Sequence, residues 1–205
     1  MGLIARNDGD NFERIPPGNY VARCYRIVDT GTQKIEFQGQ ESFKQKILVG
    51  WEVLDNETLM QDGRPFSVHK SYTNSLHEKA SLRHDLTNWR GKEFTEEELS
   101  GFSLANILSA YCLVNIVHNQ SNGNTYANVS SISPLPNGMQ KPNAVNPDVL
   151  FDLSNPDWDI FESFSDNLKG KISQSPEYKS IKDPSFAATP QSHSSEDDFD
   201  DDIPF

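Results

Sequence analysis

Aromatic and basic side chains alternate between Phe43 and Tyr72, and this pattern points most directly to chemistry. Proteins hold nucleic-acid single strands with cations that follow the phosphates and with flat rings on which bases stack. The segment offers both kinds of residue, as Phe43, Lys44, Lys46, Trp51, Arg64, Phe66, Lys70 and Tyr72. We therefore predict a nucleic-acid-binding groove here. The full candidate set also includes Arg26, Lys34, Phe37, Arg90, Lys92 and Tyr126.

The aromatic residues also admit a structural interpretation, as parts of a hydrophobic core. Trp51 has the apolar strand neighbours Val49 and Val53, which favours the core for this ring. Both interpretations stay open for Tyr72, which shares a strand face with Lys70. Arg23 and Arg26 are three residues apart, so ordinary alternation sends them to opposite faces of a strand. At most one of these two arginines is then expected to join the groove.

Patterns typical of enzymes are not found in the chain. The histidines are scattered, and His77, His84 and Asp85 lack the ligand spacing of a zinc hydrolase. The sequence contains no glycine-rich phosphate loop, no paired catalytic carboxylates and no Ser/His/Asp order. Cys24 and Cys112 lie outside any metal or redox motif, so we expect reduced core thiols. We predict no enzymatic activity, no cofactor and no bound metal.

The last twelve residues, 194–205, carry six carboxylates, no basic residue and an apolar end. A segment so charged cannot bury enough apolar surface to fold alone. A basic groove could attract the carboxylates, and a pocket with an arginine at its mouth could take the final ring and the terminal carboxylate. The sequence thus predicts a docking peptide for partner proteins. Its residues are Asp198, Phe199, Asp200, Asp201, Asp202, Ile203, Pro204 and Phe205.

The 205 residues carry a net charge of −12, and the charge is unevenly spread. Residues 1–140 contain 13 Lys and Arg against 16 Asp and Glu, whereas residues 141–205 contain 5 against 14. The acidic total therefore describes the C-terminal part, and a local basic stripe on the folded part remains compatible with nucleic acid. No signal segment and no apolar run of about 18 residues is present, so we expect a cytoplasmic protein without a membrane span.

Hydrophobic periodicity and turn residues predict a mainly β domain. Strands are expected at 19–29, 43–53, 66–72, 111–118 and 125–133, with a polar loop at 31–41. A capping box of Ser75 and Glu78 predicts a helix at 75–90, and a second box of Thr95 and Glu98 predicts a short helical turn. A helix between the third and fourth of five strands is the order of the OB-fold, a small partly open barrel.

The C-terminal third divides into three predicted segments after an OB-fold domain at 1–136. Proline-rich residues 137–147 are expected to be a linker. Apolar residues at helical spacing predict an amphipathic helical segment at 148–178, which either folds back on the barrel or pairs two subunits in a homo-oligomer. Residues 179–205 are expected to be a disordered tail that ends in the acidic tip.

Two resemblances add to these predictions. The ending Asp200–Phe205, preceded by Phe199, closely resembles the acidic tip of the bacterial single-stranded DNA-binding protein family. The body is similar to phage-encoded and mobile-element proteins that bind single-stranded DNA. The shared stretches are Gly63-Arg64-Pro65-Phe66, Trp89-Arg90-Gly91-Lys92 and Ser131-Ile132-Ser133-Pro134-Leu135-Pro136.

The resemblances imply a protein of a bacteriophage or mobile element that coats single-stranded DNA without sequence preference during replication, recombination or repair. The tip would recruit the enzymes of these processes. A different class remains open, namely an adaptor or inhibitor that binds no DNA and uses its tip to occupy host proteins. A nuclease is the third alternative. The sequence does not decide between DNA and RNA, because stacking and phosphate contacts serve both.

Overall fold

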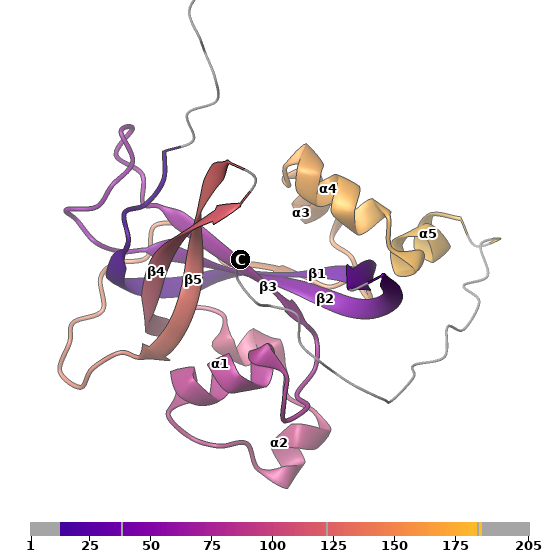
Figure 1. Ribbon diagram of the computed structural model, residues 1–205, viewed down its shortest axis with the longest axis horizontal. Coiled ribbons are helices and arrows are strands. Elements are labelled where there is room, and N and C mark those ends of the chain that lie inside the picture. Colours follow the sequence, from indigo (N-terminus) through magenta and orange to yellow (C-terminus); the bar gives the residue numbers. More distant parts are fainter. Residues whose placement is uncertain (1–12, 38, 122, 184, 186–205) are drawn as a thin grey trace, which may run out of the picture.

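The computed structural model describes residues 13–185 except 38, 122 and 184, and its fold is mainly β (Figure 1). Five strands form an antiparallel path in the order β3-β2-β1-β4-β5, and β6 pairs in parallel with β1. The strands are β1 (Gly18–Phe37), β2 (Gln40–Val53), β3 (Ser67–Thr73), β4 (Tyr111–Ser121), β5 (Asn124–Pro134) and β6 (Val149–Phe151).

The first two strands form one long hairpin, and the predicted loop at 31–41 is wrong. β1 runs for 20 residues and pairs with β2 up to Phe37 and Gln40. Gly39 supplies the positive φ of the turn. The outer half of this hairpin extends beyond β3, whose pairing with β2 ends at Lys46. Polar residues are compatible with both faces of such a ribbon, which is why the segment looks like a loop in the sequence.

One face of the sheet, called the inner face here, is covered by the helices between β3 and β4. These are α1 (Ser81–Arg90), α2 (Glu96–Ser100) and the 3-10 helix η1 (Leu104–Ile107). Trp51 of β2 packs on Trp89 of α1, with 6.0 Å between ring centroids. α1 contacts both β3 and β5, and these two strands also contact each other although no ladder joins them within the described part of the chain.

The two predicted capping boxes have different outcomes. Thr95 and Glu98 form the predicted box at the start of α2. α1 starts only at Ser81, so the box predicted at Ser75 is wrong. The Ser75 hydroxyl instead accepts a hydrogen bond from the backbone of His77, two residues on. Serine side chains commonly form such local turns in competition with helix.

The opposite face of β1 and β2, called the outer face, is partly covered by a C-terminal layer, residues 149–182. In place of the single helical segment predicted at 148–178, this layer contains β6 and three short helices, α3 (Trp158–Glu162), α4 (Asp166–Ser173) and α5 (Pro176–Lys182). The side chains of Asp157, Ser165 and Ser175 cap the N-termini of the three helices, so each helix begins separately. α5 also extends four residues into the predicted tail.

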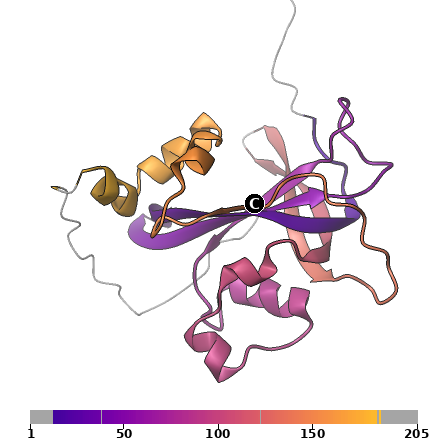
Figure 2. The ribbon, with the colours of Figure 1, turned by 180° about the vertical axis from the view of Figure 1, so that it is seen from behind.

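The C-terminal layer folds back on the sheet, which is one of the two arrangements expected. Val28 of β1 packs with Phe151, Phe161 and Phe164 in a second apolar cluster. Glu177 of α5 accepts hydrogen bonds from the backbone and hydroxyl of Thr32. The two groups of helices lie on opposite sides of the sheet in the front and side views and also from behind (Figure 2).

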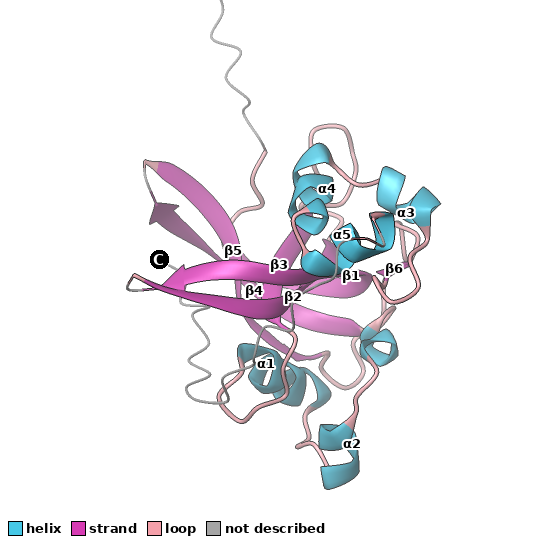
Figure 3. Ribbon diagram, turned by 90° about the vertical axis from the view of Figure 1, so that its right-hand side faces the viewer, coloured by secondary structure: helices cyan, strands magenta, loops and turns pink. Residues whose placement is uncertain are grey.

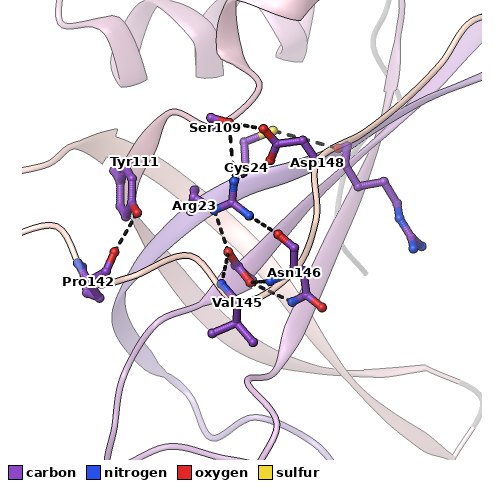
Figure 4. Close-up of polar contacts among 10 residues, drawn as sticks. Arg23, Cys24, Ser109, Tyr111, Pro142, Val145, Asn146 and Asp148 are labelled. Carbon is purple, nitrogen blue, oxygen red and sulfur yellow. Dashed lines mark hydrogen bonds and ion pairs between the residues drawn. The ribbon is translucent and has the colours of Figure 1, made fainter.

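Residues 137–147, predicted as a linker, are bound to the sheet around Arg23 (Figure 4). Arg23 is buried and pairs with the fully buried Glu52 at 2.6 Å, and also with Asp148. Glu52 in turn accepts hydrogen bonds from Asn146. Burial opposes the charge of Arg23, but the hydrogen bonds from Glu52 and Asp148 outweigh it and raise the pKa of Arg23. This network makes the segment a part of the folded unit.

Cys24 and Cys112 are free and buried, as the sequence predicts, and burial raises the pKa of Cys24 to about 12. Within the described ranges, no helix has the length and apolar character needed to span a bilayer.

Candidate nucleic-acid interface

A β-bulge in β1 decides which side chains reach the outer face. Cys24 pairs with Trp51 and Arg26 pairs with the adjacent Gly50, so Tyr25 is an extra residue on β1. The extra residue shifts the alternation that follows it. Arg23 and Arg26 therefore lie on the same face, and our expectation of opposite faces is wrong. Only Arg26 remains available to a ligand, because Arg23 is buried beneath residues 137–148.

Alternation places mostly polar side chains on the outer face of β2 and β3, apart from Leu48, which packs against the C-terminal layer. Its β2 positions pair directly with its β3 positions: Lys46 with Thr73, Leu48 with Ser71, and Gly50 with His69. We use the name outer strip for Arg26, Lys44, Lys46, Gly50, Ser67, His69, Ser71 and Thr73.

The charges of the outer strip favour an anionic ligand. Lys44, Lys46 and Arg26 are half-buried, and His69 is exposed. The outer-facing positions of β2 and β3 include one carboxylate, Glu52, which is fully buried and paired with Arg23. The accessible charge of these positions is therefore positive, within a protein of net charge −12.

Arg26 lies between two aromatic rings at the border with the C-terminal layer. Its guanidinium carbon is 5.3 Å from the ring centroid of Tyr25 and 5.7 Å from that of Phe164. These distances are within the range of cation–π attraction. Its Nε is buried and has no hydrogen-bond partner among the described residues.

His69 lies beside Arg26, across Gly50. A Cβ atom at Gly50 would be 2.7 Å from Cδ2 of His69 and 3.2 Å from Cβ of Arg26, so glycine is needed for this close approach. The hydroxyl of Tyr25 and Nε2 of His69 are 3.4 Å apart. Packing against the protein and the nearby Arg26 charge lower the pKa of His69, so the ring is neutral at pH 7.

The prediction is wrong for four groove residues, which lie on the inner face: Trp51, Phe66, Lys70 and Tyr72. Trp51, Phe66 and Tyr72 are 1%, 6% and 1% exposed, so no ring face is free to stack on a base. The hydroxyl of Tyr72 donates to Asp85 of α1 at 2.7 Å. Lys70 binds the same carboxylate at 2.9 Å. The alternative interpretation of these aromatics, as core residues, is the correct one.

Several predicted cations are bound to carboxylates away from the outer strip. Arg64 pairs with Asp62 in the loop before β3, and Lys34 pairs with Glu41 in the β1–β2 hairpin.

Arg90 and Lys92, at the end of α1, both contact Glu98. The hydrogen bond from Arg90 is the main cause that lowers the pKa of Glu98 to about 2. Arg90 is the last residue of α1, which packs on the inner face, and Lys92 follows it, so neither joins the outer strip.

Two predicted aromatics are exposed on hairpins. Phe43 in the β1–β2 hairpin is 41% exposed, and Tyr126 in the β4–β5 hairpin is 49% exposed. Both hairpins project to the same side of the molecule (Figure 3). The side chain of Phe37 and the whole tip, 198–205, lie outside the described residues.

Sequence reasoning missed three residues of this surface, namely Tyr25, Gly50 and His69. The polar alternation Ser67, His69, Ser71 was a readable signal that this face of β3 is open to solvent. Tyr25 had no such signal, because the bulge that turns it outward depends on pairing with a distant strand.

Among the described residues, no group of three or more His, Cys, Asp or Glu side chains could hold a metal ion. No protein-family model and no curated protein matches this chain.

Proposed function

We propose that this protein binds single-stranded DNA through the outer strip and the two projecting hairpins, on an OB-fold. The strand order, the contact between β3 and β5, and α1 between β3 and β4 support this fold. OB-folds bind oligonucleotides on the outer surface of their second and third strands and on the loops that flank them. In this proposal β2, β3 and the two hairpins are the counterparts of these elements.

The outer strip is the observation that carries the proposal. It provides the cations Arg26, Lys44 and Lys46 with no exposed carboxylate at the outer-facing positions of β2 and β3. Phe43 and Tyr126 add exposed rings for stacking. Cations that follow the phosphates and rings that accept any base give binding without sequence preference.

The tail sequence supports a second part of the proposal. The tip 198–205 recruits replication, recombination and repair enzymes in the cytoplasm of a bacterial host, where a phage or mobile element encodes the protein. Its carboxylates also compete with DNA for the cationic strip, because the two carry opposite charge. DNA binding then frees the tip for partners.

The test is fluorescence anisotropy of labelled oligo-dT and oligo-rU, titrated with the full-length protein at several salt concentrations. Each phosphate contact adds about 0.7 to the slope of log K against log salt for a single strand. We expect Lys44→Gln with Lys46→Gln to lower that slope by about 1.4. The control, Lys79→Gln with Lys92→Gln, removes two cations next to α1 and leaves the slope unchanged.

A DNA-free adaptor is the second candidate, and one observation favours it. The predicted cations Lys34, Arg64, Lys70 and Arg90 are all engaged by carboxylates of the same chain. If the wild-type protein binds neither oligonucleotide at low salt, the adaptor becomes the better proposal. Loss of the oligonucleotide on addition of Mg²⁺ would instead indicate a nuclease.

A further inference from the structure

Among the described residues, two arginines each lie near two aromatic rings, and the two arginines differ in one respect. Arg90 lies over Phe94 and Phe102, with 4.2 Å and 5.1 Å from its guanidinium carbon to the ring centroids, and pairs with Glu98. Arg26 lies in the same way between Tyr25 and Phe164. No ion pair in the described part of the chain involves Arg26.

A guanidinium without a carboxylate partner among the described residues keeps its charge available to an external anion. The buried atom of Arg26 without a hydrogen-bond partner is Nε. Its two terminal nitrogens donate no hydrogen bond within the described residues and are not buried without a partner, so they keep accessible surface. The fork of these terminal N–H groups is therefore open to solvent. Such a fork matches the two free oxygens of a phosphodiester group.

The surroundings of Arg26 supply a further hydrogen-bond donor. His69 lies next to it across Gly50, where the missing side chain lets the imidazole approach the strand closely. Packing against the protein and the Arg26 charge lower the pKa of His69, so its imidazole is neutral at pH 7. His69 can therefore donate an N–H hydrogen bond without repelling the guanidinium. Arg26 pairs directly with Gly50, and Gly50 pairs directly with His69, so the cation and the donor flank the same glycine.

We propose that Arg26, clamped between Tyr25 and Phe164 and assisted by His69, is the main phosphodiester anchor of the interface. This inference rests on the proposed DNA binding and names the subsite that holds the backbone. It also gives the C-terminal layer a role in binding, because Phe164 belongs to that layer. Phe164 is a positioning residue, which fixes the guanidinium and does not contact the DNA itself.

The first experiment compares Arg26→Ala with Arg83→Ala in the oligo-dT titration. Arg83 is a half-buried arginine of α1, on the other side of the sheet, whose guanidinium donates to the backbone of Leu76. We expect Arg26→Ala to weaken binding about 10- to 100-fold, as expected for a lost charge-assisted hydrogen bond. The salt slope should fall by about 0.7. Arg83→Ala should bind as the wild type does.

The second experiment tests the clamp with Phe164→Leu and Phe161→Leu. Both phenylalanines are buried in the same cluster, but Phe161 makes no ring contact with Arg26. Both variants should lose similar stability in urea, whereas Phe164→Leu alone should weaken oligo-dT binding, by about 1.5- to 5-fold if half of the cation–π attraction is lost. Equal affinity of the two variants would remove the C-terminal layer from the interface.

The outcomes separate this inference from the proposed function. If the wild type binds oligo-dT and Arg26→Ala binds equally well with the same salt slope, the anchor is wrong and the DNA-binding proposal stands. If the wild type does not bind oligo-dT, both are wrong. Weaker binding by Arg26→Ala and Arg83→Ala alike would show a general effect of net charge and would also overturn the anchor.

Discussion

The two faces of β2 and β3 are built from alternating residues of the same strands, yet they differ in almost every property. The inner face carries the large rings of Trp51 and Tyr72, closed off by α1. The outer face carries lysines, serines and a histidine. The difference teaches that an aromatic residue in a binding strand is not by itself a stacking platform, because the core needs large rings as well.

The charged groups of the two faces also differ in their partners. On the inner face, Asp85 receives both Lys70 and the hydroxyl of Tyr72, so its charge is satisfied within the fold. On the outer face, Glu52 is the neutralised group and Arg26 has no carboxylate among the described residues. A surface for an anionic ligand is therefore distinguished by the partners of its cations, more than by their number.

The largest expected effect comes from the one buried ion pair of the outer face. Arg23→Met should lower the free energy of unfolding by about 3–5 kcal/mol, because Glu52 is left charged and buried without its partner. Urea denaturation measures this. Arg64→Met is the control, since Arg64 is exposed and its pair with Asp62 should contribute less than about 1 kcal/mol. Equal losses would contradict the assigned role of Arg23.

A change on the inner face should affect stability alone. Tyr72→Phe removes the hydrogen bond to Asp85 and should cost about 1.5–3 kcal/mol in urea denaturation. Oligonucleotide affinity should stay at the wild-type value, because the ring is not accessible. The matched change Tyr126→Phe, at an exposed ring, should leave stability unchanged. Weakened DNA binding by folded Tyr72→Phe would break the distinction between the faces.

A substitution of Phe43 should change the free energy of unfolding least of all, but it should weaken oligo-dT binding. Alternation puts this residue on the inner-face side of β2, but the hairpin there extends beyond β3 and the ring is exposed. Phe43→Ala should reduce oligo-dT binding by about 1–3 kcal/mol, as for one lost base stack. Anisotropy and urea denaturation together check this, and a loss of stability without a loss of affinity would assign Phe43 to packing.

Much of the sheet could be predicted from the sequence, because alternation and turn residues are local signals. The strands ending near Val53, Tyr72 and Ser133 and the capping box at Thr95 were found in this way. Alternation also grouped Lys44 with Lys46, and Trp51 with Val49, correctly. It could not say which group faces the core, since that depends on where α1 packs.

The rest depended on contacts between distant parts of the chain. The bulge at Tyr25 exists only in the register between β1 and β2. Residues 137–148 are bound to the sheet by Arg23 and Glu52, which lie about a hundred residues earlier in the sequence. A proline-rich composition does not indicate such distant partners. The apolar residues of α3, α4 and α5 keep a common helical spacing, so the sequence pattern predicts one amphipathic helix instead of three short ones.

The parallel pairing of β6 with β1 has a consequence for synthesis on the ribosome. Arg26, Ile27 and Val28 are made early and pair with β2, but they receive their second neighbouring strand only when Val149–Phe151 emerge. Translation at about 5–20 residues per second separates the two events by several seconds. During that interval the newly made N-terminal part exposes an apolar strip around Val28, which makes it a candidate substrate for ribosome-associated chaperones.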